Sequence, residues 1–89
     1  MGDFDFPPDL VELQREFFAA DARCYEIADA LPSPMAIVGG ADVDFTELNA
    51  ARAERLAIMD RLLAHPWFDS LEPSKRNAAR NALRAAARR

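Results

Sequence analysis

The only cysteine and the only histidine of the chain have the side chains with the most reactive chemistry. Cys24 lies on an apolar helical stripe between Ala20 and Ile27. A nucleophilic thiol needs exposure and an electropositive neighbour, and a buried stripe provides neither. His65 falls in the last turn of a predicted helix, where a cationic ring interacts favourably with the final carbonyl groups. One cysteine and one histidine are also too few for a zinc site.

The acidic residues around position 44 could in principle bind calcium. Asp42, Asp44 and Glu47 have a spacing similar to that of oxygen ligands in a calcium loop. The loop pattern fails after Asp44, because Thr46 and Glu47 replace the third ligand and the turn glycine. Asp44 and Glu47 instead have the spacing of a helix capping box. We therefore expect no metal, no cofactor and no catalytic residues, and we interpret the chain as a non-enzyme.

A row of arginines runs along the C-terminal segment. Its members are spaced four apart, and Lys75 and Arg89 flank them: Arg76, Arg80, Arg84 and Arg88. From Pro73 to the end there are six positive charges and no acid, whereas residues 1–72 carry 15 acids and five arginines. This asymmetry is typical of nucleic-acid-binding arms. Such a row can also be solvated or dock on the acidic body of the chain itself. Among outside partners, the net charge of -4 opposes DNA approach, so we favour an acidic protein partner and keep nucleic acid as the alternative.

These side chains must be positioned by helices. The 89 residues include 18 alanines and ten arginines, but only three glycines and one threonine, which favours helix over sheet. Hydrophobic residues make up 51% and charged residues 29%, as in globular domains. No apolar run approaches the ~18 residues of a membrane span, and the acidic N-terminus does not resemble a secretory signal. We expect one all-α, cytoplasmic domain over residues 1–89, without membrane contact.

Three helices are predicted, at about residues 8–31, 44–65 and 73–88. Pro8 and Pro73 suit first helical positions, and prolines also follow the first two helices. We predict a small three-helix bundle, built on a long antiparallel hairpin with the short basic helix folded across it. The linker Pro32–Val43 is expected to be an irregular loop laid over the bundle.

The apolar spacing predicts which helix faces are buried. The first helix carries an unbroken heptad seam: Leu10, Leu13, Phe17, Ala20, Cys24, Ile27 and Leu31. The predicted core face of the second is Phe45, Leu48, Leu56, Met59, Leu62 and Leu63. In the third helix Leu83 should face the bundle with Ala78, Ala82 and Ala86, leaving the arginines outward.

Two further patterns concern contacts between helices or subunits. Val11, Phe18 and Tyr25 repeat every seven residues away from the seam, so we expect them to meet a protein partner or a second copy in a homodimer. In an antiparallel hairpin, Asp21 falls opposite Arg55. We predict a structural ion pair between them, because an arginine–carboxylate pair satisfies both charges near the core.

Three runs in the sequence carry a resemblance. Ala51–Leu56, His65–Phe68 and Ala79–Leu83 resemble the corresponding runs of a group of short actinobacterial helical proteins. The resemblance implies an actinobacterial, cytoplasmic origin and transfers no functional residue. We interpret the chain as a non-enzymatic protein–protein interaction or regulatory module. The alternative is a nucleic-acid-associated regulator that uses the arginine row.

Overall fold

The computed structural model describes residues 4–40 and 42–88 of the chain. The elements are α1 (Pro8–Ala30), α2 (Pro34–Val38), α3 (Thr46–Leu63), a short 3-10 helix η1 (Pro66–Ser70) and α4 (Pro73–Ala87). No strand occurs in this part of the chain, so the all-α prediction is confirmed. Among these helices, none combines the length and the apolar character that a membrane crossing requires.

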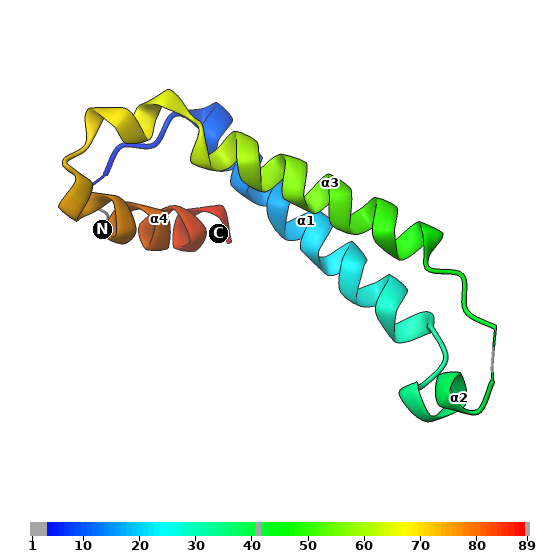
Figure 1. The fold of residues 1–89 in the computed structure, drawn as a ribbon. Helices are drawn as coiled ribbons and strands as arrows, with labels where there is room; N and C mark the ends of the chain where they lie inside the picture. The colour runs from blue at the N-terminus through cyan, green and yellow to red at the C-terminus, as the bar shows by residue number, and fades with distance from the viewer. Residues whose placement is uncertain (1–3, 41, 89) are drawn as a thin grey trace.

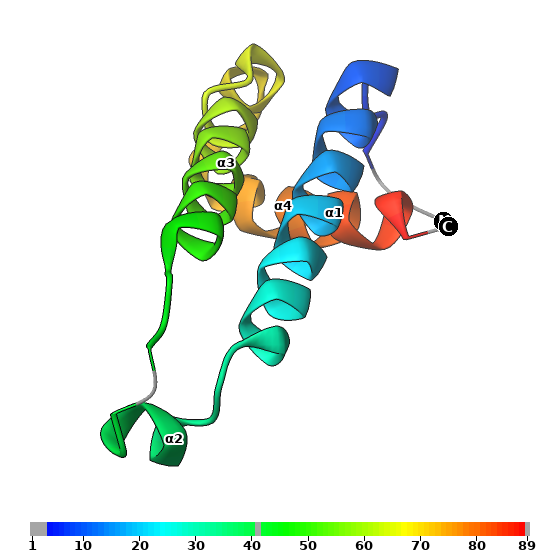
Figure 2. The ribbon, with the colours of Figure 1, turned by 90° about the vertical axis from the view of Figure 1, so that its right-hand side faces the viewer.

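The molecule is elongated, with extents of 52 × 23 × 22 Å. Helices α1 and α3 lie side by side and run in opposite directions, and α4 packs against α1 (Figure 1). Figure 2 shows α4 crossing this pair, while α2 lies at the opposite end of the molecule. One end is therefore three helices thick, and the other consists of α1 and α3 with α2 beyond them.

The linker contains a helix that we did not predict. The segment Pro32–Val43 was expected to be irregular and to cover the bundle, but α2 forms within it and all its residues are exposed. The Ser33 hydroxyl accepts a hydrogen bond from the backbone N–H of Ala36 at 3.2 Å. Serine at the cap followed by Pro34 is a local start signal for a helix. Gly40 then reverses the chain with φ of 98°, which favours glycine.

Helix α3 is shorter than predicted at both ends. It begins at Thr46 and ends at Leu63, so neither Asp44 nor His65 lies within it. Asp44 Oδ1 accepts a hydrogen bond from the Thr46 N–H at 2.9 Å, outside a capping-box arrangement. Hydrogen bonding to the Thr46 side chain, and then to its backbone N–H, lowers the pKa of the Asp44 carboxyl and keeps it ionised.

The core lies where α1, α3, η1 and α4 meet. Leu10 of α1 and Leu83 of α4 are its most completely buried large side chains. They pack with Ala20, Ile58, Leu62, Phe68 and Ala79. Farther along the α1–α3 pair, Cys24, Leu48 and Ala51 are also buried. This part of the molecule has smaller buried side chains and no third helix over it.

The buried face of α3 differs from the prediction. Leu48 and Leu62 are buried as expected, but their buried neighbours are Ala51 and Ile58. Leu56 is 61% exposed and Leu63 is 50% exposed. Apolar residues occur on two adjacent faces of α3, and packing against α1 buries only one of them. The other remains as an exposed apolar strip.

Helix α4 is rotated relative to the prediction. Its buried residues are Ala79, Leu83 and Ala87, whereas Ala78 is exposed and Ala82 and Ala86 are half-buried. These three buried positions are spaced four apart, so they form one ridge against α1. The rotation brings Arg76 and Arg80 toward the core side, where both are half-buried.

Two ion pairs join α1 to α3. Arg55 Nη1 lies 2.8 Å from Asp21 Oδ1, which is the pair predicted from the antiparallel register. This hydrogen bond raises the pKa of the Arg55 guanidinium, so it stays charged. A second pair, between Arg23 and Glu54 at 2.9 Å, is more exposed. The contacts lie at neighbouring positions and are consistent with one register.

Replacing Leu83 with Ala should destabilise the protein by about 2–5 kcal/mol, because a fully buried leucine leaves a cavity. Leu63→Ala is the matched control, since Leu63 is half exposed and should cost about 1 kcal/mol or less. Urea unfolding followed by circular dichroism measures both. Equal losses for the two variants would contradict the placement of α4.

The Asp21–Arg55 pair should show stronger coupling than the Arg23–Glu54 pair. Its side chains are about one third exposed, against more than one half for the other pair, so solvent screens it less. Two parallel double-mutant cycles with alanine, followed by urea unfolding, compare the coupling free energies. Equal coupling in both cycles would show that partial burial adds nothing to the pair.

Candidate functional site

The two residues with reactive chemistry are both engaged in structure. Cys24 is buried between α1 and α3, so its thiol is not presented to a substrate. His65 lies just before η1 and its side chain is mostly buried. Among the described residues, no three His, Cys, Asp or Glu side chains gather as a metal ion would require.

Both ring nitrogens of His65 make contacts. The Trp67 N–H donates to Nδ1 at 3.2 Å, and Nε2 lies 2.9 Å from Asp9 Oδ2. Because Nδ1 accepts, the neutral ring carries its proton on Nε2 and donates it to the carboxylate. A histidine arranged in this way has no free lone pair for a general base. The contact fastens the first turn of α1 to η1.

Most of the arginine row lies against the protein itself. Arg76 Nε donates to the carbonyl oxygen of Phe68 at 3.1 Å, and the Arg80 guanidinium lies 5.5 Å from the Phe68 ring centroid. Arg80 Nε is buried and has no hydrogen-bond partner within the described chain. Arg84 remains exposed and contacts Asn81. The expectation of a uniform outward row is therefore wrong; Arg89 lies outside the described residues.

The second apolar stripe of α1 is also mostly engaged. Val11 is half-buried and packs against the core. Phe18 is half-buried, with the guanidinium of Arg88 at 4.9 Å from its ring centroid. Such a cation over an aromatic face is favourable without any acid nearby. Of the three, only Tyr25 is exposed, at 65%. Its contact with a partner stays a prediction.

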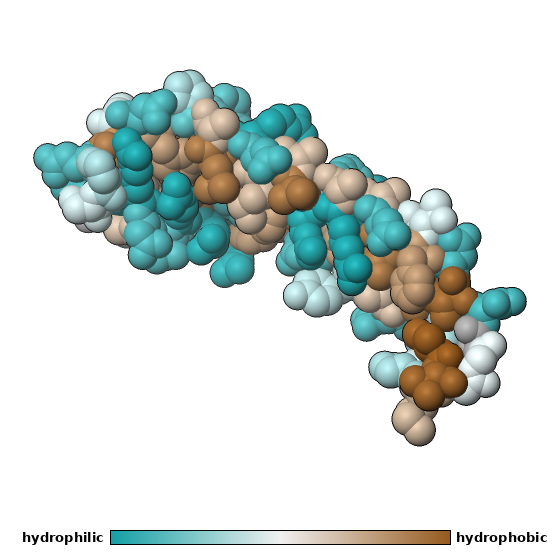
Figure 3. Space-filling view, viewed as in Figure 1, coloured by the Kyte–Doolittle hydropathy of each residue, from teal (hydrophilic) through white to brown (hydrophobic). Residues whose placement is uncertain are grey.

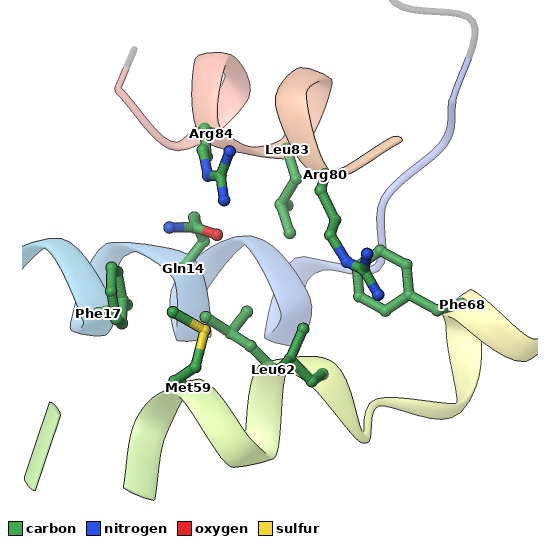
Figure 4. A pocket seen from close by; sticks show the side chains of 9 residues that line it. Gln14, Phe17, Met59, Leu62, Phe68, Arg80, Leu83 and Arg84 are labelled. Atoms are coloured by element: carbon green, nitrogen blue, oxygen red, sulfur yellow. The ribbon is translucent and has the colours of Figure 1, made fainter. Parts of the chain in front are cut away.

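A groove between α1, α3 and α4 brings apolar and basic side chains together. One part of it is lined by Phe17, Met59, Leu62, Leu63 and Leu83, with Gln14, Phe68, Arg80 and Arg84 (Figure 4). The adjoining part continues along α3 and is lined by Phe17, Asp21, Arg52, Arg55, Leu56 and Met59. The two parts share Phe17 and Met59. We call the whole surface the arginine groove.

The shape of the arginine groove does not suit a small substrate. Its more enclosed part has a volume of about 30 Å³, enough for one or two water molecules. The adjoining part has about 480 Å³, within the range of about 300–1,000 Å³ that is usual for small-molecule pockets. This part is open to solvent, however, and is lined by exposed side chains such as Leu56 and Arg52. The groove therefore fits the side chains of another protein better than an enclosed ligand.

A second exposed apolar surface lies at the far end. Met35 and Val38 of α2 are 81% and 85% exposed, and Ile37 and Phe45 are also accessible. Figure 3 shows hydrophobic side chains, in brown, gathered at this end of the molecule. Further brown side chains lie along α3, beside the teal side chains that cover α4. We call the α2 surface, formed by Met35, Ile37, Val38 and Phe45, the apolar tip.

The sequence carries a signal for both surfaces. The apolar residues of α3 occupy two faces, which exceeds what one neighbouring helix can cover. Gln14, which is buried on α1 and lines the arginine groove, was not expected, because glutamine normally indicates an exposed position. The apolar tip was signalled by Ser33 and Pro34, the start of a helix inside an assumed loop.

Asp9→Asn should reveal a pH-dependent contribution to stability. The hydrogen bond from His65 lowers the pKa of Asp9 in the folded chain. Stabilisation from a lowered pKa is present above the unfolded value of about 4 and is lost as pH falls through the folded value. We expect a lower urea midpoint for Asp9→Asn than for the wild type at about pH 6, and a smaller difference at about pH 2.5.

Asp69→Asn is the control for this measurement, because Asp69 is also exposed and close to His65 in sequence, whereas His65 Nε2 is hydrogen-bonded to Asp9. It should leave the midpoint unchanged at both pH values. A loss for Asp9→Asn that is equally large in acid would show that the carboxylate charge does not cause the effect.

Comparison with known proteins adds a family but no activity. No curated protein and no solved structure matches the chain. A family model described as a domain of unknown function, DUF8825, matches residues 9–86. The match runs from the first turn of α1 into the last turn of α4 and includes both the arginine groove and the apolar tip. The chain is therefore a member of the DUF8825 family.

Proposed function

We propose that the chain is a non-enzymatic protein–protein interaction module that binds an acidic, apolar segment of a partner in the arginine groove. The observation that carries this proposal is the exposed apolar strip of α3, with Leu56 and Leu63, beside the exposed Arg52 and Arg84. Exposed apolar side chains next to arginine are typical of protein interfaces.

The charges of the groove specify the chemistry of the partner. Its lining contains four arginines, Arg52, Arg55, Arg80 and Arg84, and only one acid, Asp21. Asp21 is already paired with Arg55, which leaves three arginines without an acid in the groove lining. A helix that carries an apolar stripe flanked by carboxylates would complement both the apolar side chains and the arginines of the groove.

This charge pattern also favours protein over nucleic acid. Arg76, Arg80 and Arg88 contact a backbone carbonyl or an aromatic ring of the chain itself, so fewer arginines are available to phosphates than the sequence suggested. The chain as a whole carries a net charge of -4, which repels a duplex.

A synthetic amphipathic helix with a leucine stripe flanked by glutamates should bind in fluorescence anisotropy. Binding should weaken about tenfold or more in Leu63→Glu and in Arg84→Glu, since each variant places a carboxylate where the peptide carries its own. The control is Arg61→Glu, which is exposed and outside the groove lining, and it should bind as the wild type does.

Two results would contradict the proposal. One is equal binding of a peptide in which lysines replace the glutamates, because it would remove the role of charge. The other is strong, salt-sensitive binding of a random DNA duplex that Arg84→Glu abolishes, which would favour the nucleic-acid alternative.

A further inference from the structure

We infer that the occupant of the arginine groove is the apolar tip of a second copy of this chain, so that the protein self-associates head to tail. This inference rests on the proposed function, because it assigns a partner to the same groove. It starts from two surfaces, each with exposed apolar side chains, that lie apart on a molecule 52 Å long.

The apolar tip is surrounded by acidic side chains only. Five exposed carboxylates flank it: Glu26, Asp29, Asp42, Asp44 and Glu47. No lysine, arginine or histidine occurs between Cys24 and Ala51. Glu26, Asp44 and Glu47 also line a hollow between the ends of α1 and α3, together with Ile27 and Leu31. This end therefore presents apolar groups in a negatively charged part of the chain.

The arginine groove has the complementary composition. Helix α4 carries Lys75 and three arginines and no acid, and the arginine groove runs from it along α3. The groove needs an apolar segment flanked by carboxylates, and the tip supplies one. An apolar contact surrounded by opposite charges meets the requirements of a specific interface.

Geometry and charge together determine the mode of association. The tip lies beyond one end of the α1–α3 pair, whereas the groove extends from α4 along the side of this pair, so the two do not meet within one chain and a second copy would bring them together. A tip-to-tip dimer would place two acidic ends against each other, and a groove-to-groove dimer would oppose two sets of arginines. Both arrangements are repelled, whereas the head-to-tail contact is attracted. Such a contact leaves a free tip and a free groove, so it continues into rings or filaments.

Sedimentation analysis over a concentration series tests self-association with purified protein alone. The wild type should increase in mass with concentration beyond a dimer, and added salt should reverse the increase. A tip variant, Met35→Asp with Val38→Asp, and a groove variant, Leu63→Glu with Arg84→Glu, should each stay monomeric. Arg61→Glu is the matched charge control and should assemble as the wild type does.

Mixing the two variants distinguishes head-to-tail from symmetric association. The tip variant retains an intact groove and the groove variant an intact tip, so an equimolar mixture should form a dimer and stop there. This recovery also shows that both variants are folded. A monomeric wild type at all concentrations, or no dimer in the mixture, would overturn the inference. If the acidic peptide still binds the groove in that case, the proposed function stands and only the second copy is excluded as its partner.

Discussion

Leu83 is the only large apolar side chain of α4, and it is buried against α1. Because α4 has no second large apolar side chain to bury, it can cover only part of the molecule. The rest of the ridge consists of Ala79 and Ala87, which allow close approach but bury little surface. The helix therefore stays at the N-terminal part of α1, where Leu10 completes the contact. The exposed apolar strip of α3 and the uncovered far end both follow from this limited reach.

The positions of the helices could be predicted more accurately than their faces. Proline marks the start of α1 and α4, and the antiparallel register was sufficient to pair Asp21 with Arg55. The buried face of α3 could not be chosen, because Leu56 and Leu63 are as apolar as Leu48 and Leu62. Only the rotation of α3 against α1 decides between them, and that rotation depends on packing between residues distant in sequence.

The candidate site was harder to predict because an arginine side chain can pair with either an acidic side chain or an aromatic ring. The spacing of Arg76, Arg80, Arg84 and Arg88 indicated a solvent-exposed row that needed acids. In the structure, aromatic rings replace acids as partners of two of these arginines: Phe68 lies beneath Arg80 and Phe18 beneath Arg88. A guanidinium group buries its flat surface on a ring while its edge remains polar. Charge spacing in a sequence does not reveal which of these partners will be near.

The two-helix section of the molecule has consequences for its internal motion. Cys24, Leu48 and Ala51 are the buried residues there, whereas the other end is held by Leu10, Leu62, Phe68 and Leu83. Segments with less buried apolar surface open at lower free energy than the global unfolding reaction. The backbone amides of α2 and of the adjoining helix ends should therefore exchange their hydrogens with solvent before those near α4 do. Binding of a partner to the far end would order α2 and the adjoining helix ends and slow this exchange. The exchange rate of each backbone amide would therefore show which residues the partner covers.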